Sequence, residues 1–78
     1  MTLSITSHSE ATTMSRQEAR QEMLPSTARH AVWWLSEDGQ SDMCVGGAAT
    51  KAEALAGAQI FCRRQGITTG ELRILAII

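Results

Sequence analysis

The chain has few of the residues on which most catalytic and metal sites depend. It contains two histidines, two cysteines, one proline, one phenylalanine and no tyrosine. His8 and His30 have no carboxylate or cysteine at a ligand spacing, so we expect no metal site. The sequence also has no paired carboxylates placed for acid–base catalysis and no glycine-rich phosphate loop. We therefore predict a protein that is not an enzyme and has no catalytic residues, no cofactor and no metal.

Neither sign of charge dominates, and no long apolar run occurs. Seven Lys and Arg residues are balanced by eight Asp and Glu residues, for a net charge of −1. That balance argues against direct binding to nucleic acid, which requires neutralisation of many phosphates. No stretch approaches the roughly 20 apolar residues that cross a bilayer, and no basic start followed by an apolar run marks a signal peptide. We expect a cytoplasmic protein that does not bind a membrane.

The composition predicts one small domain with two unequal parts. Apolar residues make up 44% of the 78 residues, which is typical of a globular protein. Residues 1–29 form a polar N-terminal extension, and residues 30–78 carry most of the large apolar side chains. Cys44 and Cys62 are predicted to be reduced, partly buried thiols, because they are far apart and form no CxxC motif. Whether they are ever oxidised is left open.

The extension contains one helix signal. In "SRQE" the Ser15 side chain can accept a hydrogen bond from the Glu18 amide, which is a capping box. We predict a helix over residues 15–24 that ends before the single proline, since the residue preceding a proline avoids helical geometry. The first dozen residues are predicted to be a loose tail. The alternation of Leu3 and Ile5 is compatible instead with a short edge strand.

The remainder predicts an α+β fold with the order β-β-α-β. Asp38 and Gly39 are typical of a two-residue hairpin loop in which both residues have positive φ. Thr50 and Glu53 form an N-terminal helix cap, and Gly66 is a typical helix stop. The predicted elements are a strand at His30–Ser36, a strand at Ser41–Gly47, a helix between Thr50 and Gly66, and a last strand at Glu71–Ile78.

Both faces of the predicted sheet are apolar, so both need a cover. The hairpin register places Trp33 and Trp34 on opposite faces, and we assign Trp33 to the core beneath the helix and Trp34 to the second face. One side of the helix is predicted to lie on the sheet through Ala54, Leu55, Ala58, Phe61 and Cys62. The second face is covered by the N-terminal helix, by a second copy of the chain in a homodimer, or by a different protein. We expect a dimer unless the N-terminal helix is the cover.

The outer side of the same helix is the first candidate for a partner-binding surface. Surface helix positions usually carry long polar side chains, which are scarce here. This smooth surface is compatible either with simple helix preference, because alanine is a good helix former, or with close approach by another chain. Trp34 and the acids of the hairpin are further candidates. The candidate contact residues are Ala52, Ala56, Ile60, Arg63, Arg64, Trp34, Glu37, Asp38 and Asp42.

The segment "GGAATKAEALAGA" resembles the strand-to-helix junction of HicB-type antitoxins, in which a glycine and a threonine precede Glu-Ala. The aspartate expected before that threonine is replaced by Ala49. The wider arrangement of hairpin, alanine-rich helix and apolar strand over residues 30–78 resembles small phage-encoded inhibitors of the anti-CRISPR type. This resemblance implies a protein-binding inhibitor of a host CRISPR–Cas nucleoprotein complex. The alternative is an antitoxin-like module that neutralises a toxin and binds operator DNA.

Overall fold

The computed structural model describes residues 3–6 and 13–78. Four strands form the main sheet in the order β1-β5-β3-β4, and the short β2 lies beside the far end of β5. β3 is antiparallel to β4 and β5, whereas β1 and β2 are parallel to β5. The elements are β1 (Leu3–Thr6), β2 (Thr13–Met14), α1 (Arg16–Gln21), β3 (His30–Leu35), β4 (Asp42–Ala48), α2 (Lys51–Arg64) and β5 (Gly70–Ile77).

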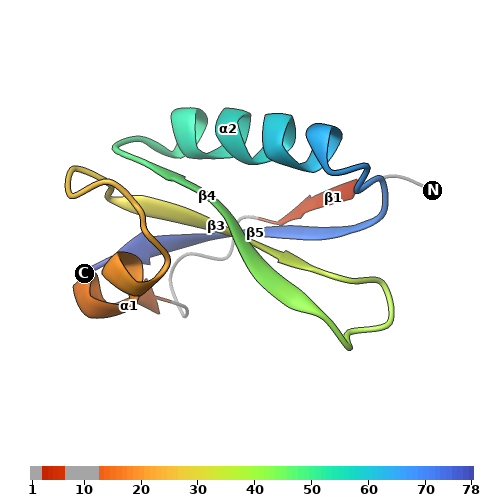
Figure 1. Cartoon of the computed structure of the whole chain (residues 1–78), viewed down its shortest axis with the longest axis horizontal. Coiled ribbons are helices and arrows are strands. Elements are labelled where there is room, and N and C mark those ends of the chain that lie inside the picture. Colours follow the sequence, from red (N-terminus) through yellow and green to blue (C-terminus); the bar gives the residue numbers. More distant parts are fainter. Residues whose placement is uncertain (1–2, 7–12) are drawn as a thin grey trace.

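The predicted α+β class and the β-β-α-β order are confirmed. α2 lies along one face of the sheet and α1 lies at one end of the opposite face (Figure 1). α2 begins as predicted, because the Thr50 side chain accepts a hydrogen bond from the Glu53 amide at 3.2 Å. It ends as predicted before Gly66, whose φ is 72° and whose amide bonds to the Arg63 carbonyl.

The N-terminal helix is confirmed but is shorter than predicted. Ser15 and Glu18 form the complete capping box. The helix ends at Gln21 and not at Leu24, because Met23 takes a left-handed conformation with φ of 62°. The Leu24 amide then bonds back to the Ala19 carbonyl at 3.0 Å, which is typical of a helix terminus closed by a left-handed residue.

The predicted edge strand at Leu3 and Ile5 is also confirmed, as β1. The prediction of a loose tail is therefore wrong for residues 3–6. The rest of that predicted tail lies outside the described residues.

The hairpin loop is longer than predicted. Ser36 and Ser41, and not Glu37 and Gln40, form its last backbone pair. Within the loop only Gly39 has positive φ, at 74°, so the predicted turn with two such residues is wrong. The loop is stabilised by Asp38, whose carboxylate accepts hydrogen bonds from the Ser36 hydroxyl at 2.6 Å and the Gln40 amide at 3.0 Å. The hairpin therefore has a four-residue loop, residues 37–40, built around an ordinary turn.

The strand register is as predicted near the loop and shifts farther from it. Trp33 pairs with Cys44 and Trp34 with Met43, as expected. Beyond them a β-bulge lets Val32 pair with Gly46 in place of Val45. Val45 and Gly46 both face α2 as a result, since Val45 belongs to the core beneath α2 and a side chain on Gly46 would meet the helix backbone.

The two faces carry separate cores, and the predicted assignment of the tryptophans is reversed. Trp34 packs on the α2 face and Trp33 on the α1 face. The buried core on the α2 face is Val32, Val45, Ala54, Ala58, Cys62, Leu72 and Ile74. The buried core on the α1 face is Met14, Ala19, Ala28, Ala31, Leu75 and Ile77. The N-terminal segment therefore covers part of the second face, which was the first of the three predicted alternatives.

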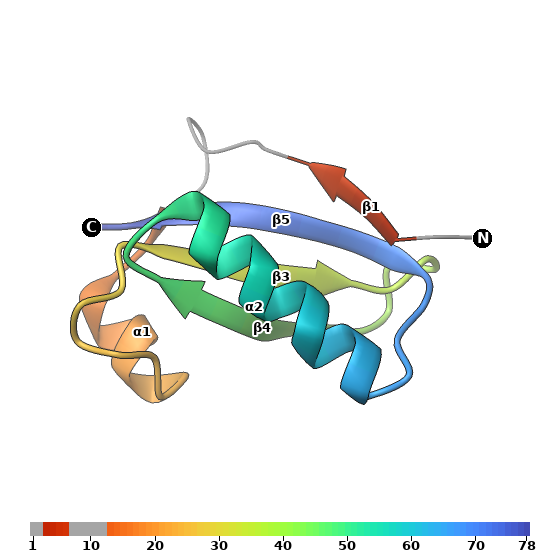
Figure 2. The ribbon, with the colours of Figure 1, turned by 90° about the horizontal axis from the view of Figure 1, so that it is seen from above.

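The handedness of the chain path explains this reversal. β4 and β5 are parallel, because both are antiparallel to the β3 strand between them. Seen from above α2, the path from β4 through α2 to β5 is a right-handed crossover (Figure 2). Connections between parallel strands have this hand almost without exception, which places α2 over the face of Val32 and Trp34. The alternation of apolar residues defines two faces but does not say which one the helix covers.

Close contact between α2 and β4 explains the small residues at their interface. A Cβ atom on Gly46 would lie 3.1 Å from the Ala54 carbonyl oxygen and 3.1 Å from the Ala58 amide nitrogen. Ala54 is 1% exposed and Ala58 is completely buried. The backbone of α2 therefore packs closely against the backbone of β4, because the side chains between them are no larger than the methyl groups of Ala54 and Ala58.

We expect Gly46→Ala and Gly57→Ala to have opposite effects on stability. The first adds a methyl group against helix backbone and should destabilise the fold by about 1–3 kcal/mol. The second replaces a helical glycine with open space around it and should stabilise the fold by about 0.5–1 kcal/mol. Urea unfolding followed by circular dichroism measures both. Equal effects of the two substitutions would contradict the close contact at Gly46.

Candidate partner-binding surfaces

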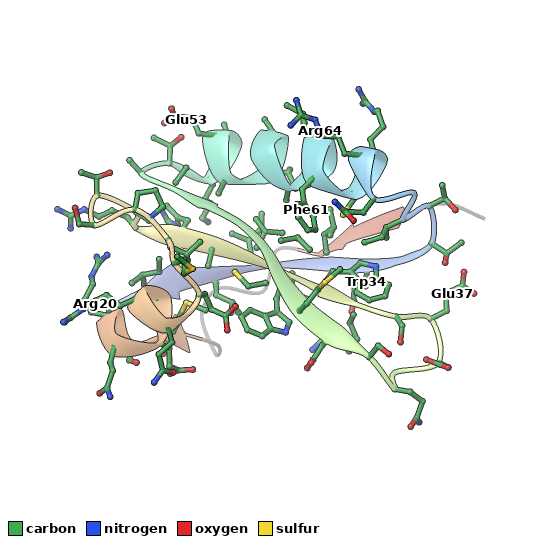
Figure 3. The ribbon with its side chains drawn as sticks, in the orientation of Figure 1. Arg20, Trp34, Glu37, Glu53, Phe61 and Arg64 are labelled. Atoms are coloured by element: carbon green, nitrogen blue, oxygen red, sulfur yellow. The ribbon has the colours of Figure 1, made fainter. Side chains whose placement is uncertain are left out.

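The predicted surface on α2 is exposed along its length. Ala52, Ala56 and Ile60 face away from the sheet, and the Ile60 side chain is 48% exposed. Arg63 and Arg64 are exposed in the last turn of the helix. Figure 3 shows Arg64 on the outer side of the helix, with Glu53 at the opposite end. The structure thus brings these five predicted contact residues together on one surface, here named the α2 ridge.

Phe61 is more exposed than predicted. It was assigned to the helix side that lies on the sheet, and Figure 3 shows it directed from α2 toward the sheet. It nevertheless remains 36% exposed. Only one helix covers this part of the sheet among the described residues, so side chains on its flanks are incompletely enclosed. Phe61 is therefore a partly exposed apolar side chain on the flank of α2, apart from the outward-facing α2 ridge.

The acids of the hairpin are exposed, but they do not have equal roles. Glu37, Asp38 and Asp42 all lie on the solvent side of the loop and its adjoining strand. The hydrogen bonds from Ser36 and from the Gln40 amide hold the pKa of the Asp38 carboxyl below its usual value. Asp38 is therefore a structural residue of the loop. Glu37 and Asp42 are left as the candidates for contact with a basic partner.

Trp34 does not lie on the less covered face for which it was chosen as a contact residue. It is half-buried on the α2 face, and its indole nitrogen donates a hydrogen bond to the Thr69 carbonyl at 2.9 Å. A Cβ atom on Gly70 would lie 2.5 Å from that nitrogen. Trp34 thus anchors the loop that enters β5, and its contact with a partner stays a prediction.

The structure reveals a further surface that the sequence pattern did not single out. α1 covers only the end of its face near Ala31 and Leu75. Beyond it lie two rows of paired residues across β4, β3 and β5 on the same face. We name them the open half-face: Cys44, Trp33 and Arg73 in one row, and Asp42, Leu35 and Glu71 in the next.

The open half-face has a half-buried apolar centre and one ion pair. Trp33, Leu35 and Cys44 are each partly exposed. The Arg73 Nε atom lies 2.9 Å from the Glu71 carboxylate. Where the half-face meets the N-terminal segment, a hollow of about 230 Å³ is lined by Thr13, Met14, Glu18, Trp33, Arg73 and Leu75. The predicted register already placed Trp33, Leu35 and Cys44 together, but the wrong choice of covered face hid their exposure.

The two thiols lie in environments that disfavour the reactive thiolate. Burial raises the pKa of Cys62, which is completely buried despite its position beside Arg63 and Arg64. Burial also raises the pKa of Cys44, and the nearby Glu22 carboxylate raises it further. Thiolate is the nucleophilic form of cysteine, so neither residue is activated in this fold.

Comparison with known protein families, characterised proteins and solved structures finds no match to this chain. Within residues 3–6 and 13–78, no three His, Cys, Asp or Glu side chains are grouped to hold a metal ion. No helix in the same residues has the length and apolar character needed to cross a bilayer.

Proposed function

We propose that this protein is a non-enzymatic binding module that inhibits a host complex by occupying one of its protein surfaces. In its concrete form, it is a phage or mobile-element inhibitor of the anti-CRISPR type that acts on a CRISPR–Cas nucleoprotein complex in the host cytoplasm. The resemblance of residues 30–78 to such inhibitors suggests the class of target. The α2 ridge suggests the means of contact.

The single observation that carries this proposal is the exposure of Ile60 beside Ala52, Ala56 and the two arginines on the outer side of α2. A branched apolar side chain that is 48% exposed supplies area that a partner can bury. Ala52 and Ala56 allow the partner backbone to approach closely. Arg63 and Arg64 lie beside Ile60 and can pair with carboxylates at the rim of the contact, where charge contributes mainly to specificity and association rate.

Ala56→Arg should abolish binding without unfolding the protein. Arginine is a good helix former, so the free energy of unfolding should change by only a few tenths of a kcal/mol. In a closed interface the same side chain introduces an unpaired charge, which costs several kcal/mol and should weaken binding about a hundredfold or more. The matched control is Gln17→Arg, which makes a similar change at an exposed position of α1.

The measurement is capture from a lysate of bacteria that contain a CRISPR–Cas system, with quantitative mass spectrometry of the bound proteins. We expect the wild type and Gln17→Arg to retain the same Cas proteins and Ala56→Arg to lose them. Retention of a toxin in place of Cas proteins would move the function to the antitoxin class. Equal capture by Ala56→Arg and the wild type would show that the α2 ridge is ordinary solvated helix.

A further inference from the structure

The open half-face lies on the side of the sheet opposite α2 and differs from the α2 ridge in both shape and charge. Its centre is a strand surface, and its only basic residue, Arg73, is already paired with Glu71. We propose that the open half-face is a second protein-binding surface, and that its partner is an arginine- and lysine-rich segment of another protein that also presents one apolar side chain.

The apolar centre and the hollow favour a protein side chain as the occupant. Trp33 belongs to both, since it lies on β3, the middle strand of the half-face, and lines the hollow. The hollow of about 230 Å³ is smaller than a usual small-molecule site, which measures about 300–1,000 Å³. It is large enough to accept one apolar side chain of a partner against Trp33, Met14 and Leu75. Aromatic residues next to such hollows often dominate the energy of an interface.

The charges around the open half-face determine which kind of partner fits. Asp42 lies in its outer row, and Glu18 lines the hollow. Burial is the main cause that raises the pKa of the Cys44 thiol, and the Glu22 carboxylate adds to it. Glu37 extends from the adjoining hairpin, as Figure 3 shows. The Asp42 and Glu18 carboxylates thus lie at the outer row and at the hollow, where they complement a basic segment.

Apart from Arg73, the basic residues of α1 and α2 lie outside the two rows of the open half-face. On the α1 side, the Arg16 side chain donates a hydrogen bond to the Ser26 carbonyl at 3.3 Å, and Arg20 points away from the sheet (Figure 3). α2 carries three basic residues and only one acid. The outer side of α2 is therefore more basic than the open half-face, which contains the partly exposed Trp33. A basic partner is guided to the open half-face and an acidic partner is repelled from it.

The test uses a synthetic peptide of alternating arginine and leucine residues as the probe. The protein labelled with ¹⁵N gives separate indole N–H signals for the two tryptophans. We expect the peptide to shift the Trp33 signal and to leave the Trp34 signal in place, because the Trp34 indole is bonded to Thr69 beneath α2. An alternating glutamate and leucine peptide should shift neither signal.

Charge-reversal variants locate the binding site. Asp42→Lys and Glu22→Lys should each weaken binding of the arginine peptide about tenfold, and the matched Glu53→Lys on α2 should change it less than about twofold. Raising the salt concentration from about 50 to about 300 mM should weaken binding to the wild type. The proposal is overturned if the peptide fails to bind at about 1 mM, if the Trp33 signal does not move, or if Glu53→Lys weakens binding as much as Asp42→Lys. None of these results depends on the α2 ridge, so the two surfaces are tested independently.

Discussion

Trp34→Ala should destabilise the protein by about 3–5 kcal/mol, which is the usual cost of truncating a large aromatic side chain in a core. Trp34 packs against the core beneath α2, and its indole nitrogen is bonded to the Thr69 carbonyl. Its removal leaves a cavity under the helix and an unsatisfied carbonyl. Trp33→Ala should cost about half as much, because the Trp33 ring lies beside an open hollow and is not closed in by a helix of its own. Chemical denaturation followed by far-ultraviolet circular dichroism measures both.

The conservative variant Trp34→Phe separates the two contributions of this residue. It retains an aromatic ring in the core but cannot donate to Thr69, so it should cost about 1–2 kcal/mol. If Trp33→Ala proves more damaging than Trp34→Ala, then α2 does not cover the Trp34 face. The original assignment from the sequence would then be the correct one.

Gly70→Ala should also destabilise the fold, by about 3 kcal/mol or more. Gly70 has φ of 112°, a conformation that is strained for alanine. Its new Cβ atom would lie 2.5 Å from the Leu35 carbonyl oxygen and 2.5 Å from the Trp34 indole nitrogen, so β5 would have to move away from β3. The effect therefore combines backbone strain with a steric clash.

Gly39→Ala is the matched control for Gly70→Ala. Gly39 has positive φ, at 74°, but no atoms lie within 4 Å of the Cβ position. It should cost only about 1–2 kcal/mol, the strain of a left-handed alanine. A similar cost for the two variants in thermal unfolding would show that no clash exists at Gly70.

Local elements were predictable because the residues that determine them are close together in the sequence. Ser15 with Glu18 and Thr50 with Glu53 each fix a helix start within four residues. Gly66 marks the end of α2 for the same reason. The hairpin position was also predictable from Asp38 and Gly39, although the loop type was not.

Features that depend on distant residues were not predictable in the same way. The bulge at Val45 and Gly46 lets the strand follow α2, which contacts it only in the folded state. The covered face depends on the order of the strands, because the right-handed crossover has a defined side only once β5 is known to lie next to β3. A proline does not end α1, since Met23 closes the helix two residues earlier.

The two candidate surfaces also differ in whether local sequence could predict them. The α2 ridge was predictable, because exposure along a single helix follows from its own periodicity. The open half-face was not, because its residues come from three strands and its exposure depends on where α1 ends. Trp34 and Trp33 exchanged roles because the right-handed crossover places α2 over the face of Trp34.

The central position of β5 has a consequence for the order in which the fold assembles. β3 and β4 are joined by a short loop and can pair early, whereas β5 must join β3 after α2 has crossed over the sheet. β1 pairs in turn with β5, so Leu3 meets Gly70 from the opposite end of the described sequence. Closing such a long loop is entropically expensive, and contacts between distant residues slow folding. We expect the hairpin to nucleate the sheet, β5 to join next and β1 to complete it last.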